Sequence, residues 1–79
     1  MWFVYILKCS DNSLYTGITT NLERRLEEHN TSPKGSKYTR ARRPVQVVFT
    51  KEFENRSGAS KEEALIKNLS RDDKFKLIK

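Results

Sequence analysis

Two runs of β-forming residues stand at the start of the chain, and a polar cluster separates them. The first run extends from Trp2 to Cys9 and the second from Leu14 to Ile18, with Asp11-Asn12-Ser13 between them. Two such runs on either side of turn-forming residues are typical of a β-hairpin. We therefore expect residues 1–20 to form a hairpin with which a later strand can pair.

A helix is predicted directly after the hairpin. Thr20 followed three residues later by Glu23 is typical of a capping box, and Leu22 with Leu26 marks a buried helical stripe. This pattern predicts a helix that runs to about Asn30.

A third strand and two further helices are predicted in the second half of the chain. Residues 45–49 are rich in β-formers, and we expect a strand there that opens after Pro44, pairs with the hairpin and is closed by Phe53. A turn over residues 55–58 precedes a helical pattern over 59–69, and Ser70 with Asp73 can cap a last short helix. The predicted order is β-β-α-β-α-α.

Length and composition limit the class of protein. A chain of 79 residues is expected to form one domain over residues 1–79, and 35% hydrophobic with 33% charged residues is typical of a soluble globular protein. The apolar opening from Trp2 to Leu7 is too short for a membrane span or a signal peptide, so we expect no membrane contact and a cytoplasmic location. The single Cys9 has no partner for a disulfide and is expected to be a packed side chain.

Basic residues outnumber acidic ones, and several of them lie close together. The 16 Lys and Arg residues against 10 Asp and Glu give a formal net charge of +6, which favours a polyanionic partner. A basic segment over residues 34–43 contains no acid and could neutralise several phosphates, while a tyrosine ring within it offers a stacking surface. Its candidate nucleic-acid-binding residues are Lys34, Lys37, Tyr38, Arg40, Arg42 and Arg43. The alternative is a solvated loop whose charge is incidental.

Two tyrosines are expected to face the same region of the hairpin. Tyr5 should share a strand face with Phe3 and Leu7, and Tyr15 on the paired strand can come within its reach. A phenol hydroxyl can orient an attacking water or take its proton, although its ordinary pKa of about 10 calls for a nearby cation. Gly17 removes a side chain where a backbone or a phosphate can approach closely. The alternative for both tyrosines is packing on the sheet with the hydroxyl in water.

Arg25 and His29 are candidate catalytic residues on the first predicted helix. They lie one turn apart, beside the predicted buried stripe. A guanidinium here could stabilise the charge of a phosphoryl transition state, and an imidazole could position water or relay a proton. Alternatively, both are ordinary polar residues of a helix surface.

Glu63 is the candidate metal ligand. Helical periodicity places it with Ile66 on the face expected to look toward the sheet, whereas Glu62 should look toward solvent. An inward carboxylate is unfavourable without a partner. A single Mg²⁺ or Mn²⁺ ion would be such a partner, with this carboxylate, waters and phosphate oxygens as its ligands. An ion pair with Arg25 or Lys67 is the alternative.

The spacing of these residues resembles the motifs of the GIY-YIG nuclease superfamily. Phe3-Val4-Tyr5 stands at its first motif and Tyr15-Thr16-Gly17 at its second, and the later residues follow at matching positions over nearly the whole chain. The longer stretches over residues 14–19, 37–44 and 66–71 are similar to those of the small standalone YhbQ-like GIY-YIG proteins of bacteria.

The resemblance implies an α+β fold in which a small three-stranded antiparallel sheet is flanked by helices. It also implies hydrolysis of nucleic-acid phosphodiester bonds with one divalent cation. Glu63 would bind the metal, Tyr5 would be the base or the water-orienting phenol, and Arg25 would stabilise the transition state. Tyr15 and His29 would support the nucleophile and the phosphate. The asparagine that many members carry after the metal-binding glutamate has no counterpart here.

Three functions follow as hypotheses. The first is a metal-dependent endonuclease acting on structured, damaged or single-stranded DNA in repair or processing, as a monomer and without a small-molecule cofactor. The second is a nucleic-acid-binding module on the same fold with weak or partner-dependent catalysis, because a fold does not guarantee its function. Substitution of Glu63 separates them, since an enzyme would lose cleavage and keep binding. A protein-interaction role, with binding insensitive to salt, is a third hypothesis.

Overall fold

The structure, a computed structural model, describes residues 1–31 and 34–78, which form three strands and four helices. In chain order, they are β1 (Trp2–Lys8), β2 (Leu14–Thr19), α1 (Leu22–Thr31), α2 (Lys37–Arg40), β3 (Gln46–Phe53), α3 (Arg56–Lys67) and α4 (Arg71–Leu77).

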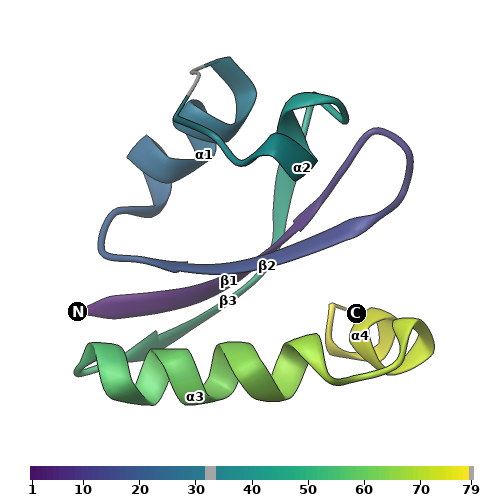
Figure 1. Ribbon diagram of the computed structural model, residues 1–79. Coiled ribbons are helices and arrows are strands. Elements are labelled where there is room, and N and C mark those ends of the chain that lie inside the picture. The colour runs from purple at the N-terminus through teal and green to yellow at the C-terminus, as the bar shows by residue number, and fades with distance from the viewer. Residues whose placement is uncertain (32–33, 79) are drawn as a thin grey trace.

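The sheet has β1 at its centre. Strands β2 and β3 pair with β1 on either side, both antiparallel, as predicted. In this register Tyr5 lies opposite Gly17 on β2 and Thr50 on β3. Helices α1 and α2 lie on one side of the sheet and α3 and α4 on the other (Figure 1). The observed architecture is the predicted α+β fold.

The alternation of side chains along β1 divides the core into two clusters. Val4 and Ile6 pack with Ala59 and Ile66 of α3. The odd-numbered residues of β1 point to the other face, where Tyr5 and Leu7 pack with Cys9 and Val45, with Leu22 and Leu26 of α1 against them. Because both faces of β1 are covered, Tyr5 is fixed in position on the side of α1.

Two predicted boundaries differ from the structure. The turn expected over residues 55–58 is instead the start of α3, because Asn55 Oδ1 accepts a hydrogen bond from the Gly58 amide at 2.9 Å and caps the helix. The third strand begins at Gln46, one residue later than predicted, and ends at Phe53, the residue expected to close it. The short helix α2 is additional to the predicted order and lies within the basic segment.

The predicted capping box of α1 is wrong, whereas the predicted cap of α4 is confirmed. Asn21 Oδ1 accepts from the Arg24 amide at 3.0 Å, so Asn21 takes the capping position instead of Thr20. Ser70 Oγ accepts from the Asp73 amide at 3.2 Å. None of the helices in the described part of the chain is both long and apolar enough to cross a membrane.

Candidate active site

The Tyr5 side chain lies directly against the backbone of β2. Tyr5 is 2% exposed and has Gly17 as its partner in the strand register. A Cβ atom added to Gly17 would lie 2.5 Å from Tyr5 Oη and 2.7 Å from Cζ, which is closer than van der Waals contact allows. The space left by Gly17 is therefore filled by the phenol of Tyr5 and is not open to a phosphate or another backbone.

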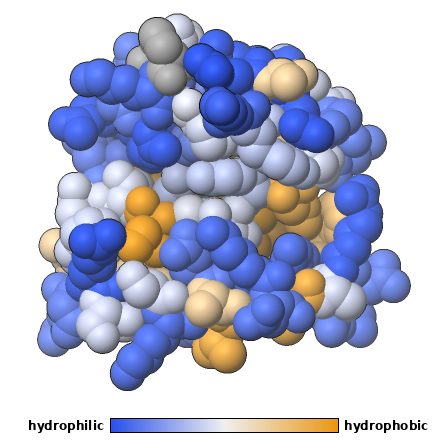
Figure 2. All heavy atoms as spheres, in the orientation of Figure 1, coloured by the Kyte–Doolittle hydropathy of each residue, from blue (hydrophilic) through white to orange (hydrophobic). Residues whose placement is uncertain are grey.

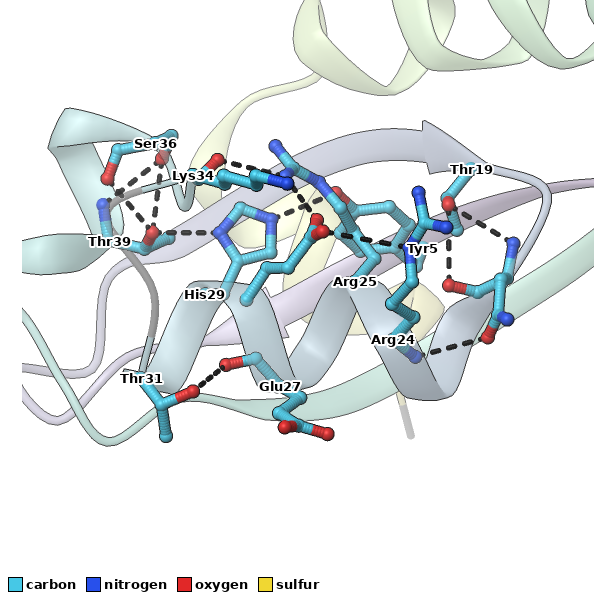
Figure 3. A network of polar contacts seen from close by, with 12 residues as sticks. Tyr5, Thr19, Arg24, Arg25, Glu27, His29, Thr31, Lys34, Ser36 and Thr39 are labelled. Carbon is cyan, nitrogen blue, oxygen red and sulfur yellow. Dashed lines mark hydrogen bonds and ion pairs between the residues drawn. The ribbon is translucent and has the colours of Figure 1, made fainter.

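A chain of hydrogen bonds connects Tyr5 to α1 and α2 (Figure 3). Tyr5 Oη lies 3.0 Å from His29 Nε2, and His29 Nδ1 lies 2.8 Å from Thr39 Oγ1. His29 and Thr39 are both 0% exposed. The Thr39 hydroxyl donates to the Ser36 carbonyl oxygen at 3.1 Å. Because the participants come from β1, α1 and α2, the chain forms only when these elements are packed together.

The hydrogen-bond partners of the imidazole favour one of its tautomers. The Thr39 hydroxyl has one proton, and when it is donated to Ser36 the oxygen is left to accept from His29 Nδ1–H. A neutral ring protonated on Nδ1 has its acceptor at Nε2, so the Tyr5 hydroxyl donates there. Burial, aided by the charge of Arg25, lowers the pKa of His29 to about 4. Burial also raises the pKa of Tyr5 to about 12, so the imidazole is neutral and the phenol protonated near pH 7.

The Arg25 guanidinium is held beside Tyr5. Its Nη1 atom donates to Glu28 Oε1 at 2.9 Å and to the Lys34 carbonyl oxygen at 3.0 Å. Burial is the largest influence on the pKa of Tyr5, and the hydrogen bond from Arg25 opposes it. The Arg25 side chain remains 27% exposed. It is therefore close enough to act on Tyr5 and open enough to contact an anion.

Tyr15 connects the buried chain to the basic segment. Its ring centroid lies 5.2 Å from that of His29, edge to face, and 5.9 Å from that of Tyr38, with which it stacks. The Arg42 guanidinium lies 4.0 Å from the centre of the Tyr38 ring. One continuous set of ring contacts thus runs from His29 to the protein surface.

Glu63 lies on α3 and has Lys67 as its ion-pair partner. Its carboxylate is 3.3 Å from Lys67 Nζ, and its side chain is 23% exposed. Arg25, the other expected partner of Glu63, pairs with Glu28 instead. The negative charge of Glu63 contributes to the raised pKa of Tyr5, after burial and Tyr15, so the carboxylate acts on the phenol. The expected contrast with Glu62 is absent, because that side chain is 26% exposed and pairs with Lys51.

The basic segment over residues 34–43 is folded against the rest of the protein and is not a free loop. Lys37 and Arg40 are exposed on α2. Arg42 Nε pairs with Asp11 Oδ2 of the hairpin turn at 3.1 Å. Arg43 donates to the carbonyl oxygens of the last turn of α1. The segment thus combines exposed cations, Lys37 and Arg40, with cations that hold it in place, Arg42 and Arg43.

Sequence reasoning misses Ser36, Thr39 and Glu28. Thr39 stands among charged residues, and only its buried contact with His29 reveals it. Ser36 Oγ accepts from the Thr39 amide at 3.2 Å as the cap of α2. Serine is a preferred residue at the N-cap of a helix, which is a weak signal that could have predicted α2.

The chain is similar to proteins of one family. The family profile described as "GIY-YIG catalytic domain" matches residues 1–76. A UPF0213 protein of Desulfotalea psychrophila is 56% identical over 99% of this chain and 71% of its own length. Another, from Oceanobacillus iheyensis, is 57% identical over 96% of this chain and 87% of its own length. The solution NMR structure of a UPF0213 protein from Bacillus halodurans has a TM-score of 0.62 and 46% identity, covering 99% of this chain and 83% of that one.

Proposed function

Since this chain belongs to the GIY-YIG family, with UPF0213 proteins as close relatives, we propose that it is an endonuclease that hydrolyses phosphodiester bonds of DNA with the help of a divalent cation. The observation that carries the proposal is the contact network that joins Tyr5, His29 and Arg25, three residue types suited to phosphodiester hydrolysis. Tyr15 lies against the same imidazole.

Tyr5 is proposed to receive the proton of the attacking water. Because its own proton points to His29 Nε2 and one lone pair of the phenol oxygen accepts from Arg25, the other lone pair remains available to water. As the water oxygen forms a bond to phosphorus, the water proton passes to Tyr5 and the Tyr5 proton passes to Nε2. The bond to the leaving oxygen breaks, and that oxygen takes a proton from solvent, to which His29 later releases its own. The phenol stays neutral throughout, which suits its raised pKa.

His29 and Arg25 support this transfer in different ways. The imidazole is a weak base in the absence of substrate, because burial and the charge of Arg25 lower its pKa. A phosphodiester anion bound beside Arg25 offsets that positive charge and makes His29 a better acceptor. The guanidinium also stabilises the negative charge that develops on the phosphate oxygens.

Glu63 is the proposed ligand of the cation. No group of three potential metal ligands gathers among the described residues, so the protein would supply one carboxylate, and waters with phosphate oxygens would complete the shell. Glu63 fits this role because it is partly exposed and its partner Lys67, 55% exposed, can turn away into solvent. A Mg²⁺ or Mn²⁺ ion would add electrostatic stabilisation to the transferred phosphoryl group.

The basic segment is proposed to bind the DNA backbone. Its exposed residues Lys37 and Arg40 are suited to phosphate contacts, which carry no sequence information. We therefore propose a substrate recognised by shape, such as structured, damaged or single-stranded DNA, processed by a monomer in the cytoplasm during repair. The alternative is a nucleic-acid-binding module, favoured by the ion pair that occupies Glu63.

A cleavage assay tests the proposal. Single-stranded, duplex, nicked and branched DNA would be incubated with Mg²⁺ or Mn²⁺ and the wild-type chain, Glu63→Gln or Arg25→Ala. We expect Glu63→Gln to abolish cleavage and Arg25→Ala to reduce it by about 10² to 10³-fold. Glu62→Gln is the matched control, since Glu62 is on the same helix, similarly exposed and also paired to a lysine. Cleavage that survives Glu63→Gln would refute the site, and salt-sensitive binding without cleavage would favour the binding module.

A further inference from the structure

A groove beside the candidate site opens between α2 and α4. It is lined by Ser13 and Leu14 of the hairpin, Tyr38 of α2, and Arg71 and Lys74 of α4, with a volume of about 200 Å³. Figure 2 shows apolar side chains in the hollow between the two helical layers, with polar side chains above and below. The groove is thus a recess with two cations on one wall and an aromatic ring on another.

The two cations of the groove lie on α4, and uncharged partners hold Arg71 in place. Arg71 Nη2 donates to the Asn12 carbonyl oxygen at 3.1 Å, and the guanidinium lies 5.0 Å from the centre of the Phe75 ring. Lys74 is half-buried. Within residues 1–31 and 34–78, neither forms an ion pair with a carboxylate, and Asp73 of the same helix pairs with Lys76. Two positive charges without a counter-ion in a recess are suited to an anion.

The groove adjoins the candidate active site through Tyr38. The Tyr38 ring, which forms one wall of the groove, stacks on Tyr15, and Tyr15 in turn contacts His29. A strand whose scissile phosphate lies beside Arg25 and Tyr5 and which passes along Tyr15 would bring a neighbouring phosphate to α4.

We propose that Arg71 and Lys74 bind a backbone phosphate of the nucleic-acid strand next to the cleaved bond. The inference rests on the proposed function and extends it, because it gives α4 a role in substrate binding that the basic segment over residues 34–43 does not include. The strand would be held from both sides of the sheet, by α2 on one side and α4 on the other. The ligand is a phosphodiester within a strand.

A binding experiment tests this assignment. Fluorescence anisotropy would measure the affinity of labelled single-stranded DNA for the Glu63→Gln chain with Mg²⁺, alone and with Lys74→Gln, Arg71→Gln or Lys76→Gln added. Lys76→Gln is the matched control, since it removes the same charge from the same helix outside the groove. We expect Lys74→Gln to weaken binding about fivefold and to reduce the slope of log K against log salt by about 0.7, the value for one lost contact on a single strand. Lys76→Gln should change affinity less than twofold, and Lys74→Arg should restore it.

Neutral phosphate substitution identifies the contact. Oligonucleotides with a single methylphosphonate at successive positions would be bound to the chain with and without Lys74→Gln. At one position near the cleaved bond, the effects of the methylphosphonate and of Lys74→Gln on the binding free energy should not be additive, because each change removes the same contact. Equal effects of Lys74→Gln and Lys76→Gln, or additivity at every position, would overturn the groove assignment and leave the proposed function standing. A wild-type chain that neither binds nor cleaves nucleic acid would overturn both. Thermal unfolding of each variant distinguishes a loss of binding from a loss of folding. If Arg71→Gln does not fold, the result for Lys74→Gln alone tests the groove assignment.

Discussion

At the scale of single residues, the Tyr5 phenol is fixed by what surrounds it. It lies against Gly17 on one strand and is hydrogen-bonded to His29 on α1, and it is 2% exposed. A buried polar group that has all its hydrogen-bond partners is held in one orientation. The same group without one of those partners destabilises the fold. Small changes around this hydroxyl should therefore affect both stability and cleavage.

Substitution of Gly17 should displace the phenol. In Gly17→Ala the new methyl group would lie 2.5 Å from Tyr5 Oη, so the hydroxyl must move away from His29. We expect the free energy of unfolding to fall by about 1–3 kcal/mol, as for overpacked cores, and cleavage to fall with it. Urea unfolding and the cleavage assay measure both. Gly58→Ala is the control, because its closest contact would be 3.1 Å from the Phe53 ring at a helical position, and a change below about 1 kcal/mol is expected.

His29 should make stability depend on pH. Its pKa of about 4 in the folded chain lies below its ordinary value of 6.5, so between these values the unfolded chain takes up a proton that the folded chain does not. The free energy of unfolding should therefore fall as the pH falls through this window, by up to about 1.4 kcal/mol per pH unit and about 3 kcal/mol in all. Because the chain has 1 histidine, a shallower slope in His29→Gln isolates its contribution. Parallel slopes in the two proteins would contradict the low pKa.

At the scale of elements, α2 has two functions that a charged segment alone would not suggest. One side of this short helix presents Lys37 and Arg40 to solvent, while Thr39 is buried against His29. Tyr38 extends from the same helix onto Tyr15. The buried side of α2 therefore positions the imidazole of His29, and its exposed side presents cations to solvent.

Loss of the Thr39 hydroxyl should change the state of His29. Thr39→Val has nearly the same shape but cannot accept from Nδ1–H, so the Nδ1-protonated form loses its partner. We expect the imidazole to populate the Nε2-protonated form, with cleavage about tenfold slower and the fold retained. The ¹⁵N chemical shifts of the two ring nitrogens report the change directly. Thr39→Ser, which keeps the hydroxyl, should retain the wild-type pattern, and an unaltered spectrum in Thr39→Val would disprove the positioning role.

The elements differ in how far they could be predicted. The alternation of side chains along β1 predicts the sheet face on which Tyr5 lies, and helical spacing predicts that Arg25 and His29 lie together. Both predictions use the strand and helix periods, which can be read from the sequence. Thr39 could not be predicted, because a helix of about one turn has no periodicity and its partner is ten residues away. The cap of α1 was misassigned because Thr20 and Asn21 are adjacent residues of similar capping preference, and only the hydrogen bond to Arg24 decides between them.

At the scale of the whole molecule, positive charge is distributed over both helical layers. The formal net charge is +6, and the cations come from the basic segment on one side of the sheet and from α4 on the other. A phosphate chain that contacts both layers releases counterions from each contact, so affinity depends on salt.

Affinity for DNA should fall steeply with salt. For about four phosphate contacts on a single strand, log K against log salt should have a slope of about −3, which is about a 50-fold loss between 50 and 200 mM. A titration over this range by fluorescence anisotropy measures the slope. Arg40→Gln, which removes an exposed cation, should lower the slope by about 0.7, whereas binding that does not respond to salt would point to a protein partner.

The central position of β1 has a consequence for synthesis on the ribosome. The strand is made first, but its second partner β3 and the helix α3 that covers Val4 and Ile6 come much later in the chain. Until then the nascent hairpin has an open edge and an uncovered apolar face, both of which can pair with another copy. The speed of translation through the second half of the chain should therefore set the yield of native protein, while leaving the stability of each finished molecule unchanged.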